Sequence, residues 1–264
     1  MITAKQYGPW AFIAGGSEGV GADGVRCAYL HFPSKNIRVR LYNLVLRMQQ
    51  CKPDTSVEVD MKLYMNRISP NVRRVRLTAA VLGLQLEEKN LDLAKGEQQK
   101  PEFLALNPNG AVPTLVDGEF VLTESRAIMQ YLASKKPESG LLPRDERARA
   151  DVIRWQFWDA SHFSPQLGTL AFQRVIKPMI GMGEPEAGKV EEALTNFRRF
   201  AAVLNKRLDG KQYVVGDSMT LADLTLASSL MYAKQAQVPL AEFPNIAAWF
   251  SRISDMDAWT KTNP

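Results

Sequence analysis

Cysteine and histidine are scarce in this chain, whose 264 residues include two of each. Cys27 and Cys51 are too few for a disulfide framework or for a four-cysteine metal site. His31 and His162 leave no material for a histidine-rich centre, so we expect no metal ion. The chain also lacks a secretory signal and the apolar run of about 18 residues that a membrane span requires. These absences predict a cytoplasmic protein that binds no metal and no membrane.

The charge balance gives no sign of a nucleic-acid partner. The 33 basic and 28 acidic side chains leave a net charge of +5, and the basic residues are scattered rather than clustered. Hydrophobic residues make up 45% of the chain and charged residues 23%, which is typical of globular proteins and sufficient for a core. The length suits one large domain or two small ones.

Residues 1–60 differ from the rest of the chain. An apolar segment at 10–14 precedes the glycine-rich run GGSEGVG, so that residues 1–22 resemble the start of a short-chain dehydrogenase, whose glycine loop approaches a cofactor pyrophosphate. However, Asp23-Gly24 interrupts the helix that should follow, and residues 25–59 show no sustained period. We therefore expect residues 1–60 to form an irregular N-terminal extension that performs no chemistry.

From Met61 onward the local patterns agree with one another. Apolar residues recur at helical spacing over 72–82, and Gly83 follows as a helix stop. Asp117-Gly118 is a dipeptide favoured in the two-residue turn between strands. The elements expected here are strands at 62–65, 84–86, 112–116 and 119–122, and helices at 72–82 and 124–134. This order predicts a small mixed sheet with helices packed on it.

Only helices are expected beyond a linker at 135–140, which is rich in charge and in helix-breaking residues. Six apolar residues step by three and four positions over 190–208, which predicts one amphipathic helix. Thr220 and Asp223 have the spacing of a capping box, so we assign Asp223 to folding rather than to chemistry. A further helix follows Pro244. The second half should therefore be all α.

Four motifs in this part of the chain carry a resemblance to a known family. They are Ser69–Arg76 (SPNVRRVR), Asn107–Pro113 (NPNGAVP), Glu124–Ile128 (ESRAI) and Thr220–Asp223 (TLAD). Through them, Met61–Pro264 resembles the cytosolic glutathione S-transferases, in a bacterial, serine-type form of phi, theta or nu character. The resemblance implies an α/β thioredoxin-like, glutathione-binding domain over 61–138 and an all-helical domain over 145–264. It also implies glutathione as co-substrate and a homodimer.

Ser69 has two interpretations. From the residues alone it is the N-cap of the following helix, with Pro70 in the first helical position. Arg73 and Arg74 lie in the first turn, where positive charge opposes the helix dipole, and they suggest that an anion is held nearby. By the resemblance, the Ser69 hydroxyl is catalytic and donates a hydrogen bond to the glutathione thiolate.

The remaining site residues follow from the same resemblance. The Val112-Pro113 bond is expected to be cis, and the backbone of Val112 to contact the cysteinyl part of glutathione. Glu124 and Ser125 are expected to bind its γ-glutamyl end, although both are also ordinary first-turn residues. Gln98 and Gln99 are expected to bind the glycyl end of glutathione, at positions where the family often has His-Lys at the glycyl carboxylate. Because this departure removes a positive charge, either the next residue, a lysine, replaces it or the segment is a solvated loop.

One predicted helix carries a group of aromatic residues: Trp155, Phe157, Trp158, His162 and Phe163. Some can line a pocket for the electrophile, and most are expected to pack in the core. We expect His162 to be a structural helix residue rather than a base.

Three functions remain open. The first is transfer of glutathione to a small hydrophobic electrophile, with Ser69 stabilising the thiolate. The second is disulfide or peroxide reduction by glutathione, because Ser69-Pro70-Asn71 resembles the Thr-Pro-Asn segment of nu-class relatives. The third is a non-catalytic binding protein of the same fold, which the Gln98-Gln99 departure supports. The first agrees best with the four motifs.

Overall fold

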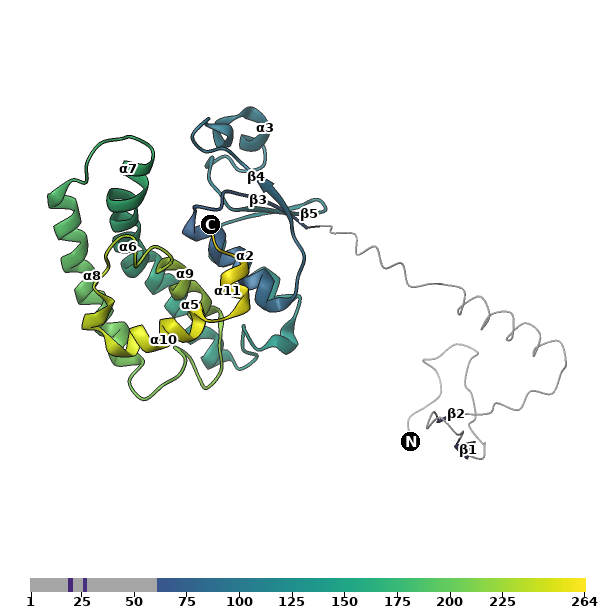
Figure 1. Cartoon of the computed structure of the whole chain (residues 1–264). Helices are drawn as coiled ribbons and strands as arrows, with labels where there is room; N and C mark the ends of the chain where they lie inside the picture. Colours follow the sequence, from purple (N-terminus) through teal and green to yellow (C-terminus); the bar gives the residue numbers. More distant parts are fainter. Residues whose placement is uncertain (1–18, 21–25, 28–60) are drawn as a thin grey trace. The chain divides into compact units, whose positions relative to one another are not determined.

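The computed structural model describes residues 19–20, 26–27 and 61–264 (Figure 1). The chain divides into two compact units, Met1–Glu58 and Val59–Pro264. In the first unit, strand β1 (Gly19–Val20) pairs antiparallel with strand β2 (Arg26–Cys27). The rest of the glycine-rich run, and of the extension expected over 1–60, lies outside the described residues.

Four strands of the second unit form one mixed sheet in the order β4-β3-β5-β6. Strand β3 (Met61–Met65) runs parallel to β4 (Glu87–Asn90) and antiparallel to β5 (Thr114–Asp117), which pairs in turn with β6 (Phe120–Thr123). The prediction of a strand at 84–86 is therefore wrong, because the strand lies at Glu87–Asn90. Leu84 and Leu86 instead pack half-buried against the core beneath the sheet, which explains their alternation in the sequence.

The turn between β5 and β6 is displaced by one residue from its expected position. Asp117 is the last residue of β5 and pairs with Phe120, so the two turn residues are Gly118 and Glu119. Gly118 has a φ of 59°, a left-handed conformation that glycine adopts without a steric penalty. The Asp117 carboxylate accepts a hydrogen bond from the Tyr131 hydroxyl at 2.5 Å.

Helices α2 (Pro70–Leu82) and α4 (Ser125–Ser134) pack on the sheet. Their apolar faces meet Leu63 and Leu115 of the two central strands in a small core that excludes water. Gly83 ends α2 with a φ of 66°, as expected for a left-handed C-cap. Short helices η1 (Glu97–Gln99) and α3 (Pro101–Leu104) connect β4 to β5, and η2 (Pro137–Ser139) follows α4.

The second half is entirely helical, as the sequence predicts. Its elements are α5 (Glu146–Trp158), the π-helical η3 (Asp159–Phe163), α6 (Ser164–Ala171), the π-helical η4 (Phe172–Ile176), α7 (Lys177–Met179), α8 (Ala187–Arg207), α9 (Leu221–Ser229), η5 (Leu240–Glu242), α10 (Pro244–Ser254) and α11 (Asp257–Lys261). Every residue of α9 is buried, and α9 packs against α2 of the thioredoxin-like half (Figure 1). None of the described helices is long and apolar enough to cross a membrane.

Asp223 stabilises the start of α9, as its spacing from Thr220 predicts. Its carboxylate accepts hydrogen bonds from the backbone N–H of Thr220 at 2.8 Å and of Val214 at 2.9 Å. The indole N–H of Trp249 donates to the same carboxylate at 3.0 Å. Burial nevertheless raises the pKa of Asp223, because desolvation outweighs these bonds. Asp223 thus joins α9, α10 and the preceding loop.

Candidate active site

Four of the residues expected to bind glutathione lie around one small pocket of about 80 Å³. Val112 and Pro113 form one wall, and Glu124 and Ser125 form another. Asn71, in the first turn of α2, also lines this pocket. The pocket therefore lies where a loop, the start of α4 and the start of α2 converge.

The loop before Val112 is held in place by Asn107, whose side chain is buried. Its amide nitrogen donates to the carbonyl oxygen of Ala111 at 2.7 Å and to the hydroxyl of Thr114 at 3.1 Å. Its amide oxygen accepts from the backbone N–H of Asn109 at 3.1 Å. The Val112-Pro113 bond is cis, as the resemblance led us to expect. Asn107 thereby fixes the backbone conformation of the loop that leads to Val112 and Pro113.

Glu124 and Ser125 open helix α4 at the pocket. Glu124 has a φ of 67°, a left-handed conformation that is uncommon for a residue with a side chain. Such strain concentrates at functional sites. Ser125 is only 3% exposed and is the first residue of the helix. Both residues line the pocket, and the first N–H groups of a helix, which have no partner within it, favour an anionic ligand.

Ser69 is the N-cap of α2 and is half-buried. Its hydroxyl oxygen accepts from the backbone N–H of Val72 at 3.4 Å, which is long for such a bond. Because this bond uses only a lone pair, the hydroxyl proton remains free to be donated. Ser69 itself does not line the pocket, although Asn71 does. The Tyr232 hydroxyl, from the helical half, donates to the carbonyl of Ile68 at 2.9 Å and supports the turn before Ser69.

Arg73 and Arg74 do not face an anion site, so that expectation is wrong. The Arg73 guanidinium stacks 3.7 Å from the ring centroid of Trp259 and donates to the Trp259 carbonyl at 2.9 Å. Arg74 is fully buried and donates to the Asp159 carboxylate at 3.1 Å and to the Ser229 hydroxyl at 2.6 Å. Burial lowers the pKa of both guanidinium groups to about 10. Both arginines join the two halves of the protein.

Asp159 is a residue that the sequence reasoning missed. Its carboxylate is buried, and it accepts from Arg74, from the Ser229 hydroxyl at 2.8 Å and from Arg126. Since Arg126 follows Ser125 in α4, Asp159 connects the starts of both helices that border the pocket. The only signal in the sequence was an acidic residue within an aromatic helical segment.

Gln98 and Gln99 lie in η1, beside the pocket but outside its lining. They pack on Gly110, where a Cβ atom would lie 2.5 Å from the Gln99 amide nitrogen. The Gln98 side-chain oxygen is buried and has no hydrogen-bond partner among the described residues. Lys100 forms an exposed ion pair with Glu97 at 3.1 Å rather than reaching the pocket.

The aromatic group of the helical half belongs mainly to the core. Trp155 and Phe163 are buried, and Trp158 stacks on Phe163 with ring centroids 5.6 Å apart. His162 is exposed and stacks on Phe200, which agrees with a structural role. Phe157 is 68% exposed and belongs to neither core cluster of the described residues.

Comparisons with known proteins agree with this fold. The family model described as "Glutathione S-transferase, N-terminal domain" matches residues 59–134, and "Glutathione S-transferase, C-terminal domain" matches residues 164–257. Glutathione S-transferase 3 of Zea mays is 38% identical over 210 residues, with 76% of this chain and 92% of the relative covered. Glutathione S-transferase D7 of Drosophila melanogaster is 33% identical over 192 residues, with 72% and 82% covered. A solved structure of glutathione S-transferase-I bound with lactoylglutathione has a TM-score of 0.71 at 33% identity, with 77% of this chain and 98% of that chain covered.

Proposed function

Because this chain belongs to the glutathione S-transferase family, we propose that it conjugates glutathione to a small hydrophobic electrophile with Ser69 stabilising the thiolate. The chain has the family's fold, and its curated relatives are named as transferases, so it is an enzyme of this class. The non-catalytic alternative is accordingly not retained. The assignment of this chain to a serine-type subclass, with Ser69 as the catalytic hydroxyl, is part of the same proposal.

One observation carries the proposal. Val112, Glu124 and Ser125 converge on a pocket that extends to Asn71, two residues from the Ser69 hydroxyl. The start of α4 offers N–H donors for the γ-glutamyl carboxylate, and the Glu124 carboxylate suits its ammonium group. The backbone of Val112, which lines the same pocket, would contact the cysteinyl part. A glutathione bound in this way would direct its thiol toward the start of α2.

The proposed chemistry is nucleophilic attack by a thiolate. A free thiol is largely protonated at neutral pH, and a hydroxyl donor beside the sulfur lowers its pKa. The positive end of α2 adds typically 0.3–1 kcal/mol of stabilisation. Ser69 is suited to this task because its hydroxyl proton is not used by the N-cap bond. The thiolate then forms a bond to the electrophilic atom and displaces its leaving group or adds to its double bond.

A second activity, reduction of disulfides by glutathione, is favoured by the orientation of Asn71. The Asn71 side-chain oxygen accepts a hydrogen bond from Arg74, which has only donors. The amide nitrogen of Asn71 is therefore the end left to donate at the pocket. Such a donor would hold a sulfur atom together with the Ser69 hydroxyl.

Substitution of Ser69 tests the proposal. Ser69→Ala should lower turnover with chlorodinitrobenzene roughly ten- to thousand-fold, the range for loss of one preorganised donor. Ser69→Gly removes the same hydroxyl but retains most of the N-cap stability, so it controls for folding. The bound thiol should titrate at higher pH in both variants. Unchanged turnover would contradict the role of Ser69. For the second activity, Asn71→Ala should lower turnover with hydroxyethyl disulfide, and unchanged turnover would contradict that activity.

We also propose a cytoplasmic homodimer that binds no nucleic acid. In a two-fold dimer each subunit supplies the same surface patches, and a stable interface buries at least about 1,200 Å². Sedimentation at micromolar concentration provides the test. A species of twice the 29.5 kDa chain mass is expected, and one at the chain mass would contradict the dimer.

A further inference from the structure

The peptide unit between Ile68 and Ser69 is held by hydrogen bonds at both of its polar ends. The Ser69 N–H donates to the Asn66 carbonyl at 3.1 Å, which closes the turn between β3 and α2. The Ile68 carbonyl accepts from the Tyr232 hydroxyl at 2.9 Å. Because the N–H and the C=O of one peptide unit lie in a common plane, these two bonds together fix the orientation of that plane.

The position of the Ser69 hydroxyl depends on this plane. The Cα atom of Ser69 lies between two peptide units, and α2 holds the second of them, since the Ser69 carbonyl accepts from the Arg73 N–H at 3.0 Å. With both units fixed, the direction of the Cα–Cβ bond is fixed as well. The hydroxyl's own bond to the Val72 N–H is 3.4 Å long and holds the side chain only weakly. The backbone on either side of Ser69 therefore does most of the positioning.

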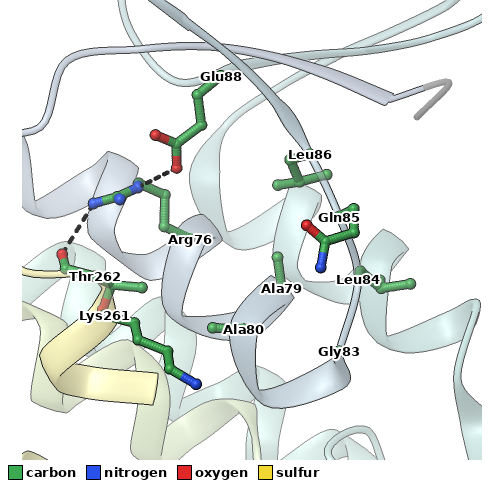
Figure 2. A pocket seen from close by; sticks show the side chains of 10 residues that line it. All are labelled: Arg76, Ala79, Ala80, Gly83, Leu84, Gln85, Leu86, Glu88, Lys261 and Thr262. Atoms are coloured by element: carbon green, nitrogen blue, oxygen red, sulfur yellow. Dashed lines mark hydrogen bonds and ion pairs between the residues drawn. The ribbon is translucent and has the colours of Figure 1, made fainter. Parts of the chain in front are cut away.

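Helix α2 is anchored independently of Tyr232. Arg76 donates to the Glu88 carboxylate of β4 at 2.6 Å and to the Thr262 carbonyl at 3.0 Å (Figure 2). Two further arginines of α2 contact the helical half, as described above. Loss of the Tyr232 hydroxyl would therefore leave α2 in place and release only the peptide unit before Ser69.

Tyr232 acts on this turn from the helical half. It lies between α9 and η5 and is buried. Burial raises the pKa of its hydroxyl, although the nearby Arg73 charge opposes this shift, so Tyr232 is protonated at neutral pH and acts as a donor. A phenol has a single proton to donate, and here the Ile68 carbonyl accepts it. The hydroxyl therefore supports the backbone rather than donating to a thiol or an electrophile.

We propose that Tyr232 is a positioning residue for the transfer reaction, whose hydroxyl holds the peptide unit before Ser69 so that the Ser69 hydroxyl meets the sulfur atom of bound glutathione. This inference rests on the proposed function and extends it. The residues that line the glutathione pocket belong to the thioredoxin-like half. Through Tyr232, the reactivity of the thiol would also depend on how the helical half is packed against it.

Tyr232→Phe tests the proposal, because it removes the donor and retains the ring. With chlorodinitrobenzene, kcat at saturating glutathione should fall roughly tenfold, since a displaced Ser69 hydroxyl keeps part of its effect. The KM for glutathione should not change, because the residues that line its pocket are retained. The pKa of the bound thiol, measured from the pH dependence of kcat, should rise. A merely structural role of Tyr232 would not move this pKa.

Tyr131→Phe is the matched control. It also removes one phenol hydrogen bond in the same half of the protein, the bond to the Asp117 carboxylate. This variant should leave kcat and its pH dependence unchanged. Circular dichroism shows whether both variants are folded at the assay temperature.

The double variant separates this inference from the proposed function. If Tyr232 acts through Ser69, Tyr232→Phe should cause no further loss of kcat once Ser69→Ala is present. The inference alone is overturned if Ser69→Ala is impaired while Tyr232→Phe retains full kcat, or if Tyr232→Phe lowers kcat equally in both backgrounds. Full activity of Ser69→Ala would overturn the proposed role of Ser69, and this inference with it.

Discussion

The buried pair of Arg74 and Asp159 provides the sharpest test of how the two halves are held together. Both side chains are fully buried, and their atoms approach to 3.1 Å. Desolvation lowers the pKa of Arg74 to about 10, and the Asp159 charge opposes that shift. Asp159→Asn keeps the size and one acceptor oxygen but removes the negative charge. Arg74 then remains as a buried cation without a counter-ion.

The expected loss of stability is large because the uncompensated charge cannot reach water. Breaking a buried ion pair from one side costs about 3–5 kcal/mol, and the lower end applies since the amide oxygen of the variant still accepts a hydrogen bond. For a unit of about 200 residues, 1 kcal/mol corresponds to roughly 2–4 °C in the thermal midpoint. Asp159→Asn should therefore lower the midpoint by about 6–12 °C.

Thermal unfolding followed by circular dichroism at pH 7 measures this effect. Asp151→Asn is the matched control on α5, because Asp151 pairs with Arg154 and Arg207 while all three side chains are at least 27% exposed. Exposed pairs contribute about 0–1 kcal/mol, so the control should shift the midpoint by no more than a few degrees. Equal midpoints for the two variants would refute the assignment of Arg74 and Asp159 as an inter-domain contact.

Three further predictions concern the site loop, the backbone of Glu124 and acid stability. Asn107→Ala leaves the bonds of its loop unmade, so stability measured by urea unfolding should fall by about 1–3 kcal/mol and the KM for glutathione should rise. Glu124→Gly relieves the positive φ of 67° and should raise the thermal midpoint while also raising that KM; a lower midpoint would contradict the strain. Hydrogen bonds from Lys189 and Lys177 lower the pKa of Glu186 from 4.5 to about 2, so its stabilising contribution is complete above pH 4.5 and is lost as the pH falls toward 2. Glu186→Gln should therefore reduce the fall in thermal midpoint over that pH range.

Local features of the fold could be read from the sequence because their causes lie within a few residues. Pro70 at the start of α2 and Gly83 at its end act on the backbone at those positions alone. The apolar stripe over 190–208 reports which face of α8 is buried, whatever it packs against. The turn after β5 was misplaced because Asp117 and Gly118 suit two neighbouring registers, and strand pairing decides between them.

The active-site assignments drew on the resemblance rather than on residue chemistry. Val112, Pro113, Glu124 and Ser125 are unremarkable in composition, and only the order of the motifs marked them. Their convergence around one pocket depends on the sheet order, which brings the loop before β5 and the helix after β6 together. Asn107 and Asn109 belonged to a recognised motif, yet no local rule assigned their bonds.

The sequence by itself determined the order of most helices and strands, the caps and the family, because these depend on short-range spacing and on motifs, whereas it misplaced the strand at Glu87–Asn90. Only the tertiary structure decided what Arg73 and Arg74 do. Their partners Trp259, Asp159 and Ser229 are 85 to 186 residues distant along the chain. From the sequence alone, a positive charge near a helix start suggests an anion site. In the structure these arginines are instead buried against the helical half, where they bind other partners. Pairing across such separations depends on the packing of whole elements, and no local pattern records it.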